Sequence, residues 1–481
     1  MKIVRNLVIA AFALLAAGIL VFGQRAGADR PKDVVVVSYW EKWTGNEAEQ
    51  MKQIVTDFNR TVGKEKGIFV EYLSMSNVNQ KTLVATAAGV PPDIAGLWDT
   101  QVAQFAAINA LEPLDELASA HGIGPGYYKP VYWGACQYQN ILWALVSTPA
   151  AVALHYNKKI FTESAETLRA AGLDPGRPPR TLEELDRYAK ALDKEGADGR
   201  IERAGYLPME PGWFLVHTPV WFGGRLFDEE GQRFTIDDPA NVRAYTWVQS
   251  YSKKLGKESM TEFRSGMGGF NSAQNPFLVG TVVMEQQGPW MANYIDNLAP
   301  KMSRAAFPKE REKGMRVEDR RRNYEWAVAP FPSAAEGGED ATYTGFDVLV
   351  IPRGAAHREE AFEFIAYVNR QDVMEKLCSL HCKNSPLAKV SERFLREHPN
   401  PYIDVFEKLA SSPNARPVPP VPIWPEVNEE MNNTIQRIYL LEAEPEAALK
   451  ESQARLTEKW DRFRALQSAR QGEAAARGGR Q

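Results

Sequence analysis

The hydrophobic pattern of the first hundred residues alternates between the two periods of secondary structure. Residues 34–40 are almost continuously apolar and rich in valine, which is typical of a strand buried on both faces of a parallel sheet. Over residues 48–58, apolar side chains recur at the spacing of one helix face. A second strand at 68–73, a helix at 80–88 and a third strand at 93–98 follow. Together they predict a right-handed βαβαβ unit, whose ligands would lie at the carboxyl ends of the strands.

The same alternation continues along the rest of the chain and predicts an α/β protein. A strong helix is expected at 361–368, and further strands at residues 141–147, 151–156, 281–284, 325–329 and 347–351. Two capping boxes, Thr44 with Glu47 and Thr181 with Glu184, are predicted to begin helices. The proline-rich residues 416–425 predict an extended crossing segment.

The N-terminal residues have the features of a secretion signal. A basic start precedes an apolar run at 7–22, and Ala26 and Ala28 supply the small residues that a signal peptidase requires. We therefore expect residues 1–28 to be a signal peptide and the protein to be exported to the periplasm. The alternative is an uncleaved segment that tethers the protein to the membrane, because the run approaches the length that crosses ~30 Å of hydrocarbon.

Composition and motifs exclude several classes of function. The chain has 481 residues and a formal net charge of −4, so it lacks the basic excess of nucleic-acid binders. Three cysteines are too few for a disulfide framework, and the sequence has no phosphate-binding, zinc-protease or nucleophile-elbow motif. We interpret Cys378, His381 and Cys382 as a buried helix end rather than a metal half-site. We expect no catalytic residues, no metal and no cofactor, a solvated charged insertion at 309–322, and a disordered tail at 469–481.

Aromatic residues beside glycine and proline at segment ends indicate a ligand. A tryptophan flanked by turn residues lies near a surface, where its flat ring can pack on the C–H face of a sugar while acidic and amide side chains hold the hydroxyls. The segments concerned are Trp40, Trp43, Trp98, Glu210-Pro211-Gly212-Trp213, Trp221, Gly288-Pro289-Trp290, Tyr343-Thr344-Gly345-Phe346 and Ile423-Trp424-Pro425. Behind a secretion signal, this set favours a carbohydrate-sized ligand.

Short motifs that are weak alone become informative through their order. In chain order they are Phe58-Asn59, the run from Ala87 to Ile94, Leu111-Glu112-Pro113-Leu114-Asp115, His155-Tyr156-Asn157-Lys158, the run from Pro179 to Leu185, Gly223-Gly224, Gly280 to Met284, Gly288-Pro289-Trp290 and Ala361-Phe362-Glu363-Phe364. This order resembles the family 1 extracellular solute-binding proteins of ATP-driven (ABC) importers, the group that contains maltose-binding protein. The chain departs from many members in reading Trp221-Phe222 where they have Trp-Gln.

The resemblance implies a two-lobe periplasmic-binding-protein fold with hinge strands and a ligand cleft between the lobes. It implies lobes that are discontinuous in sequence, the N-terminal lobe at 33–148 and 346–398 and the C-terminal lobe at 149–345 and 399–468. It also implies a receptor without catalysis that captures a sugar or oligosaccharide and delivers it to an inner-membrane ABC permease. We expect a monomer that does not bind nucleic acid.

The strand ends and the resemblance together suggest the ligand-binding residues. They are Trp40, Glu41, Trp98, Asp99, Glu210, Trp213, Trp290, Tyr343 and Trp424. Trp290 follows a glycine and a proline, which predicts an indole held in a turn just after a strand rather than hidden in a helix. Two alternatives stay open: the same fold with a charged ligand, such as a phosphorylated polyol or a polyamine, or a secreted carbohydrate-active enzyme with two acids about 5 or 9 Å apart.

Overall fold

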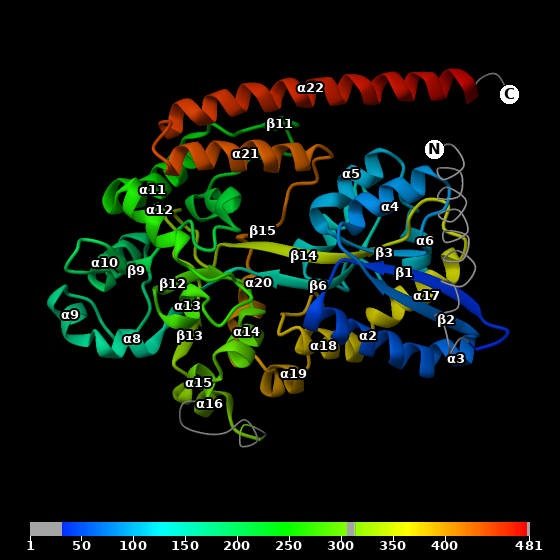
Figure 1. The fold of residues 1–481 in the computed structure, drawn as a ribbon. Helices are drawn as coiled ribbons and strands as arrows, with labels where there is room; N and C mark the ends of the chain where they lie inside the picture. The colour runs from blue at the N-terminus through cyan, green and yellow to red at the C-terminus, as the bar shows by residue number, and fades with distance from the viewer. Residues whose placement is uncertain (1–30, 305–311, 313, 479–481) are drawn as a thin grey trace, which may run out of the picture.

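The protein has two α/β lobes, each built on its own sheet and joined by strands that cross between them (Figure 1). The computed structural model describes residues 31–304, 312 and 314–478, with side chains described to residue 470. The predicted signal peptide at 1–28 lies outside the described residues. No helix in the described part of the chain combines the length and hydropathy that a membrane crossing requires.

The N-terminal lobe begins with the βαβαβ unit that the hydrophobic pattern predicts. Its elements are β1 Val35–Glu41, α2 Gly45–Arg60, β2 Ile68–Ser74, α4 Val78–Ala87 and β3 Ile94–Trp98. β1 pairs in parallel with both β2 and β3, because its continuously apolar residues can be covered on both faces. The sheet order is β15-β14-β3-β1-β2, and β6 also pairs with β14. The carboxyl ends of β1 and β3 therefore meet at one edge of this sheet.

The helix after β1 buries the face that its periodicity predicts. Ala48, Met51, Val55 and Phe58 of α2 are all buried in the core of the lobe. The capping box predicted at Thr44 is wrong, because Thr44 occupies the N-cap position but its side chain accepts no capping hydrogen bond.

The second predicted capping box forms as expected in the C-terminal lobe. The Thr181 side chain accepts a hydrogen bond from the backbone N–H of Glu184, at 3.1 Å, at the start of α10 Leu182–Leu192. That cap satisfies one of the free N–H groups of the first helical turn.

A five-stranded sheet forms the centre of the C-terminal lobe, in the order β13-β7-β12-β9-β8. Its strands are β7 Ala153–Asn157, β8 Lys194–Glu195, β9 Ile201–Tyr206, β12 Val282–Gln287 and β13 Trp326–Ala329. β12 is parallel to β9 and antiparallel to β7. The strands predicted at 281–284 and 325–329 are thus confirmed. Both pair with β7.

Two long antiparallel strands link the lobes. β6 Leu145–Ala151 pairs with β14 Thr342–Val350, and the register shifts between Asp347 and Val348. The short strand β15 Ala415–Arg416 adds to the other side of β14. These strands extend past the segments predicted at 141–147 and 347–351, because they continue from the sheet of one lobe towards the other.

The remaining elements cover the two sheets. In the N-terminal lobe and beside it they are α3 Val62–Lys66, η2 Asp99–Gln101, α5 Val102–Ala107, α6 Asp115–Ala120, α7 Pro130–Ala135, β4 Gln137–Tyr138, β5 Ile141–Leu142, α17 Arg358–Val368, α18 Gln371–Leu380, α19 Glu392–Glu397 and α20 Ile403–Ala410. In the C-terminal lobe they are α8 Lys158–Glu163, α9 Ala165–Ala170, η3 Leu215–Phe222, β10 Phe227–Asp228, β11 Arg233–Phe234, α11 Pro239–Leu255, α12 Lys257–Ser265, α13 Pro276–Val279, α14 Met291–Leu298, α15 Pro300–Ser303 and α16 Val317–Asn323.

Helix α20 lies at the boundary between the lobes. Glu407 forms an ion pair with Lys129, the N-cap residue of α7, at 2.8 Å, which ties the helix to the N-terminal lobe. The Tyr402 hydroxyl, just before the helix, donates to the backbone carbonyl of Trp326 in the other sheet, at 3.0 Å. The lobe boundary expected at 398/399 thus falls just before an element that contacts both lobes.

The charged run expected to be a solvated insertion is docked in its C-terminal half. Arg320 of α16 is buried and donates to the backbone carbonyls of His398 and Pro399, at 2.9 and 2.6 Å. Arg321 donates to the carbonyl of Pro401, at 2.8 Å. The expectation of solvation is therefore wrong for these residues, because backbone carbonyls of residues 398–401 accept from the guanidinium groups. Residues 309–311 and 313 lie outside the described residues.

The chain ends in two helices, α21 Trp424–Tyr439 and α22 Pro445–Gly478. Figure 1 shows α22 along the edge of the molecule, beside α21 and reaching over the N-terminal lobe. The Gln467 side chain donates to the backbone carbonyl of Ala107, at the end of α5, at 2.9 Å. The tail predicted to be disordered from residue 469 is helical to Gly478, because it continues a helix that is already formed.

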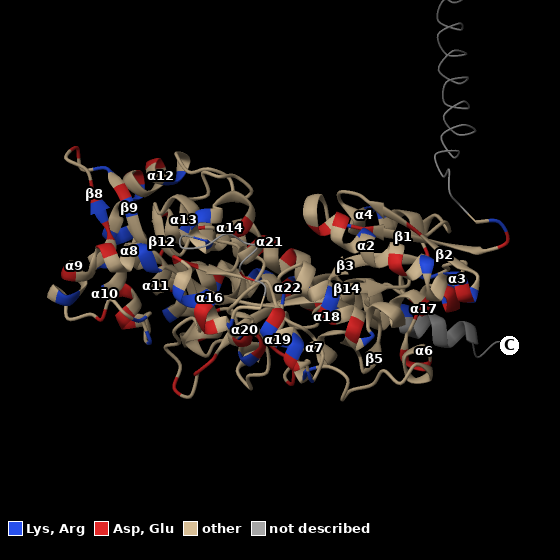
Figure 2. Ribbon diagram, turned by 90° about the horizontal axis from the view of Figure 1, so that it is seen from below, with Lys and Arg blue, Asp and Glu red and all other residues tan. Residues whose placement is uncertain are grey.

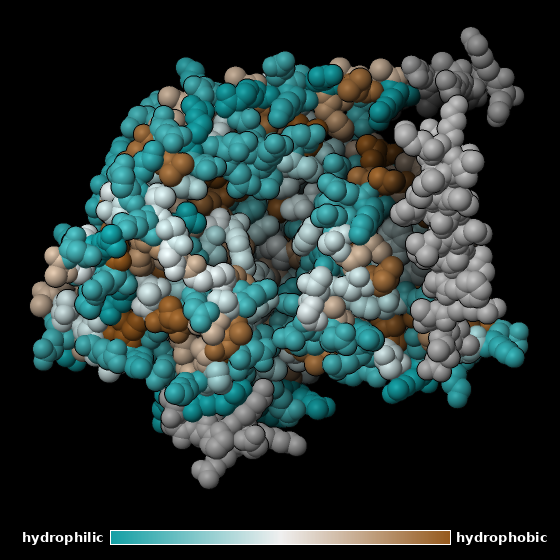
Figure 3. All heavy atoms as spheres, in the orientation of Figure 1, coloured by the Kyte–Doolittle hydropathy of each residue, from teal (hydrophilic) through white to brown (hydrophobic). Residues whose placement is uncertain are grey.

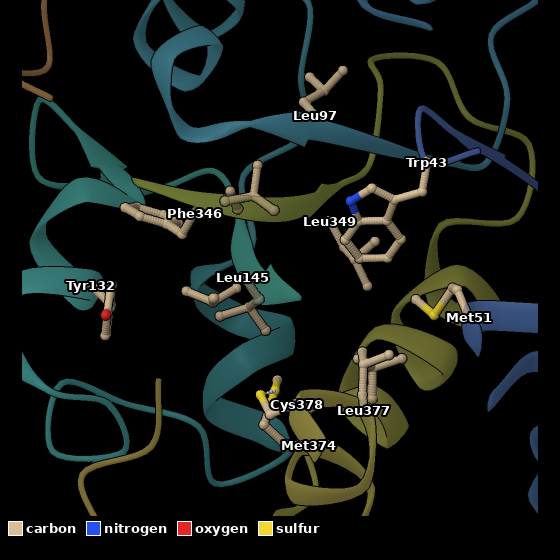
Figure 4. Packing of buried hydrophobic residues seen from close by; sticks show 14 of the residues in the cluster. Trp43, Met51, Leu97, Tyr132, Leu145, Phe346, Leu349, Met374, Leu377 and Cys378 are labelled. Atoms are coloured by element: carbon tan, nitrogen blue, oxygen red, sulfur yellow. Dashed lines mark hydrogen bonds between the residues drawn. The ribbon is translucent and has the colours of Figure 1, made fainter. Parts of the chain in front are cut away.

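The cysteines, which the sequence analysis did not assign to a metal site, lie in the hydrophobic core. Figure 4 shows Cys378 beside Met374 of α18, and Trp43 packed with Met51 and Leu349. The three cysteines are buried and none of them forms a disulfide, and among the described residues no cluster of His, Cys, Asp and Glu could hold a metal ion. Basic and acidic residues are interspersed over both lobes (Figure 2), and the face in Figure 3 is mostly hydrophilic with scattered apolar groups.

Candidate ligand-binding cleft

A cavity of about 850 Å³ lies between the lobes, at the carboxyl ends of β1 and β3. Its lining comes from both lobes and from the crossing strand β14. Aromatic side chains dominate it, the larger ones being Trp43, Trp98, Trp213, Trp290, Tyr294 and Tyr343. This is where the topology of the N-terminal lobe predicts a ligand.

Five of the residues proposed from the sequence meet in this cavity. They are Trp98, Asp99, Trp213, Trp290 and Tyr343. The indoles of Trp98 and Trp213 are 45% and 48% exposed, so part of each ring is accessible to a ligand. The residues come from the end of β3, from two loops of the C-terminal lobe and from β14, so only the fold brings them together.

The other four proposed residues do not line the cavity. Trp40 is half-buried against the N-terminal core, and the neighbouring Glu41 is fully buried, where it accepts hydrogen bonds from the Tyr39 hydroxyl and the Lys42 backbone. Both belong to β1 itself, whose side chains point into the layers that cover the sheet.

Glu210 and Trp424 are likewise held by the C-terminal lobe. Glu210 forms an ion pair with Arg264, at 3.7 Å, and burial raises the pKa of its carboxyl. Trp424 is 2% exposed and stacks on His217, with ring centroids 6.1 Å apart. A proline-flanked tryptophan was expected near the surface, but the first turn of α21 buries this one.

Several lining residues were not proposed as ligand-binding residues. Trp43 lies in the short connection after β1, and its place among the turn-flanked aromatics was a usable signal. Phe270 and Tyr294 form one wall with Trp213, each ring centroid 4.5 Å from the next. Lys383 follows α18 and reaches the cavity from far along the chain, so no local pattern indicates it.

Asp347 and Lys383 line the floor of the cavity, and two further buried charged groups, Lys42 and Glu41, lie beside them. Asp347 accepts from Lys383, at 2.8 Å, and pairs with Lys42, at 3.0 Å. Burial alone would raise the pKa of the Asp347 carboxyl, but the charges of the two lysines outweigh it and hold that pKa well below its usual range. Lys42 also pairs with Glu41, at 3.2 Å. Two cations thus face two carboxylates, and the charge of the floor is compensated.

The two lysines also order the tryptophans. The Lys42 ammonium lies 5.0 Å from the ring centroid of Trp43 and 5.4 Å from that of Trp98. The Lys383 ammonium lies 5.6 Å from Trp43 and 5.8 Å from Trp290. Each contact is within the range of a cation–π interaction, so three indoles are held by a charge network rather than by close packing alone.

Trp290 sits in a turn after a strand, as the sequence predicts. It is the N-cap residue of α14 and is half-buried. Its ring covers Gly288 so closely that a Cβ there would come within 2.3 Å of the indole. Glycine is therefore required at position 288 for the indole to adopt this orientation.

Asp99 is the carboxyl group whose environment favours the neutral form. Its Oδ2 atom is shielded from water and has no hydrogen-bond partner among the described residues. Burial raises the pKa of Asp99 to about 8, and the negative charge of Asp347 adds to the shift. At neutral pH the group can offer a ligand an O–H donor as well as an acceptor.

A smaller compartment of about 440 Å³ continues the cavity past the rings of Trp43 and Trp98. Its lining is rich in amides, among them Asn271, Asn293 and Asn297. The side chain of Asn293, from α14 of the C-terminal lobe, donates to the backbone carbonyl of Leu380 at the end of α18, at 3.2 Å. The described structure thus has contacts between the lobes on the ligand side of the hinge.

Known proteins share this architecture. A family model described as bacterial extracellular solute-binding protein matches residues 44–375. The maltotriose-binding protein of Pyrococcus abyssi is 21% identical over 345 residues, which are 71% of this chain and 64% of that protein. The sn-glycerol-3-phosphate-binding periplasmic protein of Pectobacterium atrosepticum is 24% identical over 261 residues, 51% of this chain and 52% of that protein. The matched part is therefore less than two thirds of either relative's length.

A solved structure, CpMnBP1 with mannobiose bound, is 25% identical to this chain with a TM-score of 0.70. The likeness covers 87% of this chain and 99% of that one, and so includes both lobes.

Proposed function

The chain belongs to the bacterial extracellular solute-binding proteins, and on that premise we propose that it captures a sugar or oligosaccharide in the interlobe cavity and delivers it to an ABC permease. The protein would be exported to the periplasm by residues 1–28 and act there as a monomeric receptor. Closure of the lobes around the ligand would select the conformation that a permease recognises.

The observation that carries this proposal is an aromatic cavity above a floor of compensated charge. Trp98, Trp213, Trp290 and Tyr343 offer ring faces, which suit the apolar C–H faces of pyranose rings. Asp99 offers a hydroxyl-binding group that stays neutral near pH 7. A neutral, hydroxyl-rich ligand satisfies all of these groups without adding an unpaired charge to a buried site.

A charged solute is the second candidate, because one relative is named for binding sn-glycerol 3-phosphate. The charges of the cavity argue against it. Lys42 and Lys383 are both engaged by Asp347, so an anionic ligand would have to compete with a buried carboxylate for them. We therefore favour the neutral ligand.

Calorimetric and tryptophan-fluorescence titrations distinguish the two candidates. Mannobiose, maltotriose and glycerol 3-phosphate would each be added to the mature protein at low and high salt. We expect heat and a fluorescence change with a neutral oligosaccharide, and an affinity that salt changes little. Binding of glycerol 3-phosphate alone, with an affinity that falls as salt rises, would contradict the proposal in favour of a charged solute.

Delivery to a permease has its own test. A strain that lacks this gene is expected to lose uptake of the sugar that binds in vitro, and the intact gene is expected to restore it. Normal uptake in the deletion strain would show that the protein is not required for transport of the sugar that it binds.

A further inference from the structure

A second cavity, of about 820 Å³, lies behind the ligand cleft. One pair of rings separates the two. Tyr343 lines the cleft, and its ring stacks on that of His217 with centroids 3.6 Å apart and planes within 7°. His217 in turn lines the second cavity and stacks on Trp424. The two cavities therefore share a wall that is two aromatic rings thick.

The walls of the second cavity come from both lobes and from the crossing segment. Val131 belongs to α7 of the N-terminal lobe, and Val216 and Val220 belong to η3 of the C-terminal lobe. Pro417 and Pro419 lie in the crossing segment after β15. The valine and proline side chains give this cavity apolar walls. The imidazole of His217 is neutral, because burial lowers its pKa to about 3.

Two arginines face this apolar cavity, Arg225 and Arg416. Arg416 is half-buried, and one of its amino groups donates to the carbonyls of Pro413 and Ala415, at 2.6 and 2.9 Å. The pKa of Arg416 lies below its usual value, first because of burial and then because of the charge of Arg225. Both arginines line the same cavity and their charges repel, so an anion bound there would be stabilised by both.

Acidic residues also line the second cavity, at its rim. Asp228 is paired with Arg233, at 3.4 Å, and Glu229 and Glu230 are exposed in the turn between β10 and β11. The rim would therefore disfavour a ligand of high negative charge, and a single carboxylate on an apolar body meets both the arginines and the walls.

We propose that the second cavity binds a small aromatic carboxylate, and that its occupant is linked to the ligand cleft through the hinge. The ring of the ligand would lie among the prolines, valines and His217, and its carboxylate would meet Arg225 and Arg416. An occupant that contacts both lobes favours the lobe arrangement in which the cavity has this shape.

The sign of the linkage follows from the contacts on the cleft side. In the described arrangement the Asn293 side chain donates to the carbonyl of Leu380, at 3.2 Å, and accepts from the Cys382 thiol, at 3.1 Å, so the lobes already touch across the cleft. A ligand behind the hinge stabilises this closed arrangement and should raise the affinity for the cleft ligand. By reciprocity, the cleft ligand should raise affinity behind the hinge by the same factor. Only this last step rests on the proposed function.

The site is tested with 4-(trifluoromethyl)benzoate, followed by fluorine NMR on the mature protein. 4-(Trifluoromethyl)benzyl alcohol keeps the ring without the charge, and trifluoroacetate keeps a charge without the ring. We expect the benzoate to bind about tenfold more tightly than either, as one charge-assisted contact implies. Equal binding of the benzoate and the alcohol would overturn the role of the arginines.

Two variants and one control locate the binding. Arg225→Gln removes an exposed guanidinium and is expected to weaken benzoate binding about fivefold or more, while Val131→Phe is expected to block it by filling the cavity. Arg243→Gln removes an exposed arginine of α11 that does not line the cavity and should change nothing. If all three variants bind the benzoate like the parent protein, the site is elsewhere and the proposal fails.

The link to the hinge is measured without any sugar. Glu65 and Glu166 are exposed on opposite lobes, and all three native cysteines are buried, so Glu65→Cys and Glu166→Cys can carry selective spin labels. We expect saturating benzoate to narrow the distribution of distances between the labels. An unchanged distribution with benzoate bound would refute the linkage, and a failure of every sugar titration would leave this result standing.

Discussion

The indole of Trp290 lines the cleft from a turn, in an orientation that is possible only because residue 288 is glycine. If the ring stacks on the ligand, Trp290→Ala should weaken binding by about 1–3 kcal/mol, which is the value of burying a large apolar side chain. Because the ring is half-buried, its removal should cost less stability than the about 3–5 kcal/mol of a core tryptophan. Calorimetry gives the first quantity and chemical unfolding the second. A large loss of stability with unchanged affinity in the folded protein would place Trp290 in the core instead.

Asp99 makes stability depend on pH in a direction that can be worked out. Its pKa of about 8 in the folded protein lies above the value near 4 of an unfolded chain, so between these values the folded state holds a proton that the unfolded state has lost. The free energy of unfolding should therefore fall as pH rises from about 4 to 8, and then stay level.

Asp99→Asn keeps the shape of the neutral carboxyl and cannot ionise. We expect it to be more stable than the parent at pH 9 and nearly equal to it at pH 4, as measured by urea unfolding at both values. A stability difference that is the same at both pH values would mean that Asp99 is ionised in the folded protein.

At this scale the sequence indicates part of the cleft. Trp98 and Asp99 could be predicted because they lie at the carboxyl end of a buried strand, and Trp290 could be predicted because it lies in a turn after a strand. Tyr294 and Lys383 reach the cavity from α14 and from the end of α18, so their role depends on the packing of the two lobes. No local pattern in the chain contains that information.

Among the secondary-structure elements, α22 packs on the C-terminal lobe through several buried side chains, of which Trp460 is the largest. Trp460 is 5% exposed, contacts Phe227 and Phe234 with ring centroids 5.4 and 6.3 Å away, and donates to the carbonyl of Gln232 at 2.7 Å. We expect Trp460→Ala to cost about 3–5 kcal/mol of stability. The affinity of the folded fraction for sugar should be unchanged, because this residue does not line the cleft. Unfolding curves and calorimetry on the same sample check both, and a loss below 1 kcal/mol would show that α22 is held by other contacts.

The elements that could be predicted are those with a strong hydrophobic period. The strands β1 and β3 and the buried face of α2 follow directly from that pattern. The docking of α16 could not be predicted, because a run of charges gives no sign that Arg320 will donate to the backbone carbonyls of residues 398 and 399. Charge patterns describe solvation, whereas the partner of a buried charge is set by the tertiary fold.

For the whole molecule, ligand binding and stability are linked through the two lobes. A ligand that binds only the folded protein should raise the free energy of unfolding by about 2.7 kcal/mol at one hundred times its dissociation constant. We expect a sugar that binds the cleft to raise the melting temperature in this concentration-dependent way, as scanning calorimetry would show. No increase at saturation would mean that the sugar does not bind the native state.

The position of α22 at the end of the chain also affects the order in which the two lobes can fold. The hairpin of β10 and β11 precedes Trp460 by more than two hundred residues, yet its aromatic side chains are covered only when that tryptophan arrives. A chain that emerges from a membrane N-terminus first can complete its N-terminal lobe only once β14, α17 and α18 have emerged, since domains fold as their residues appear. Its C-terminal lobe must wait for the last helix. If the protein is exported as proposed, its cleft therefore stays unfinished until almost the whole chain has crossed, and an interrupted translocation should yield no protein that binds the proposed sugar.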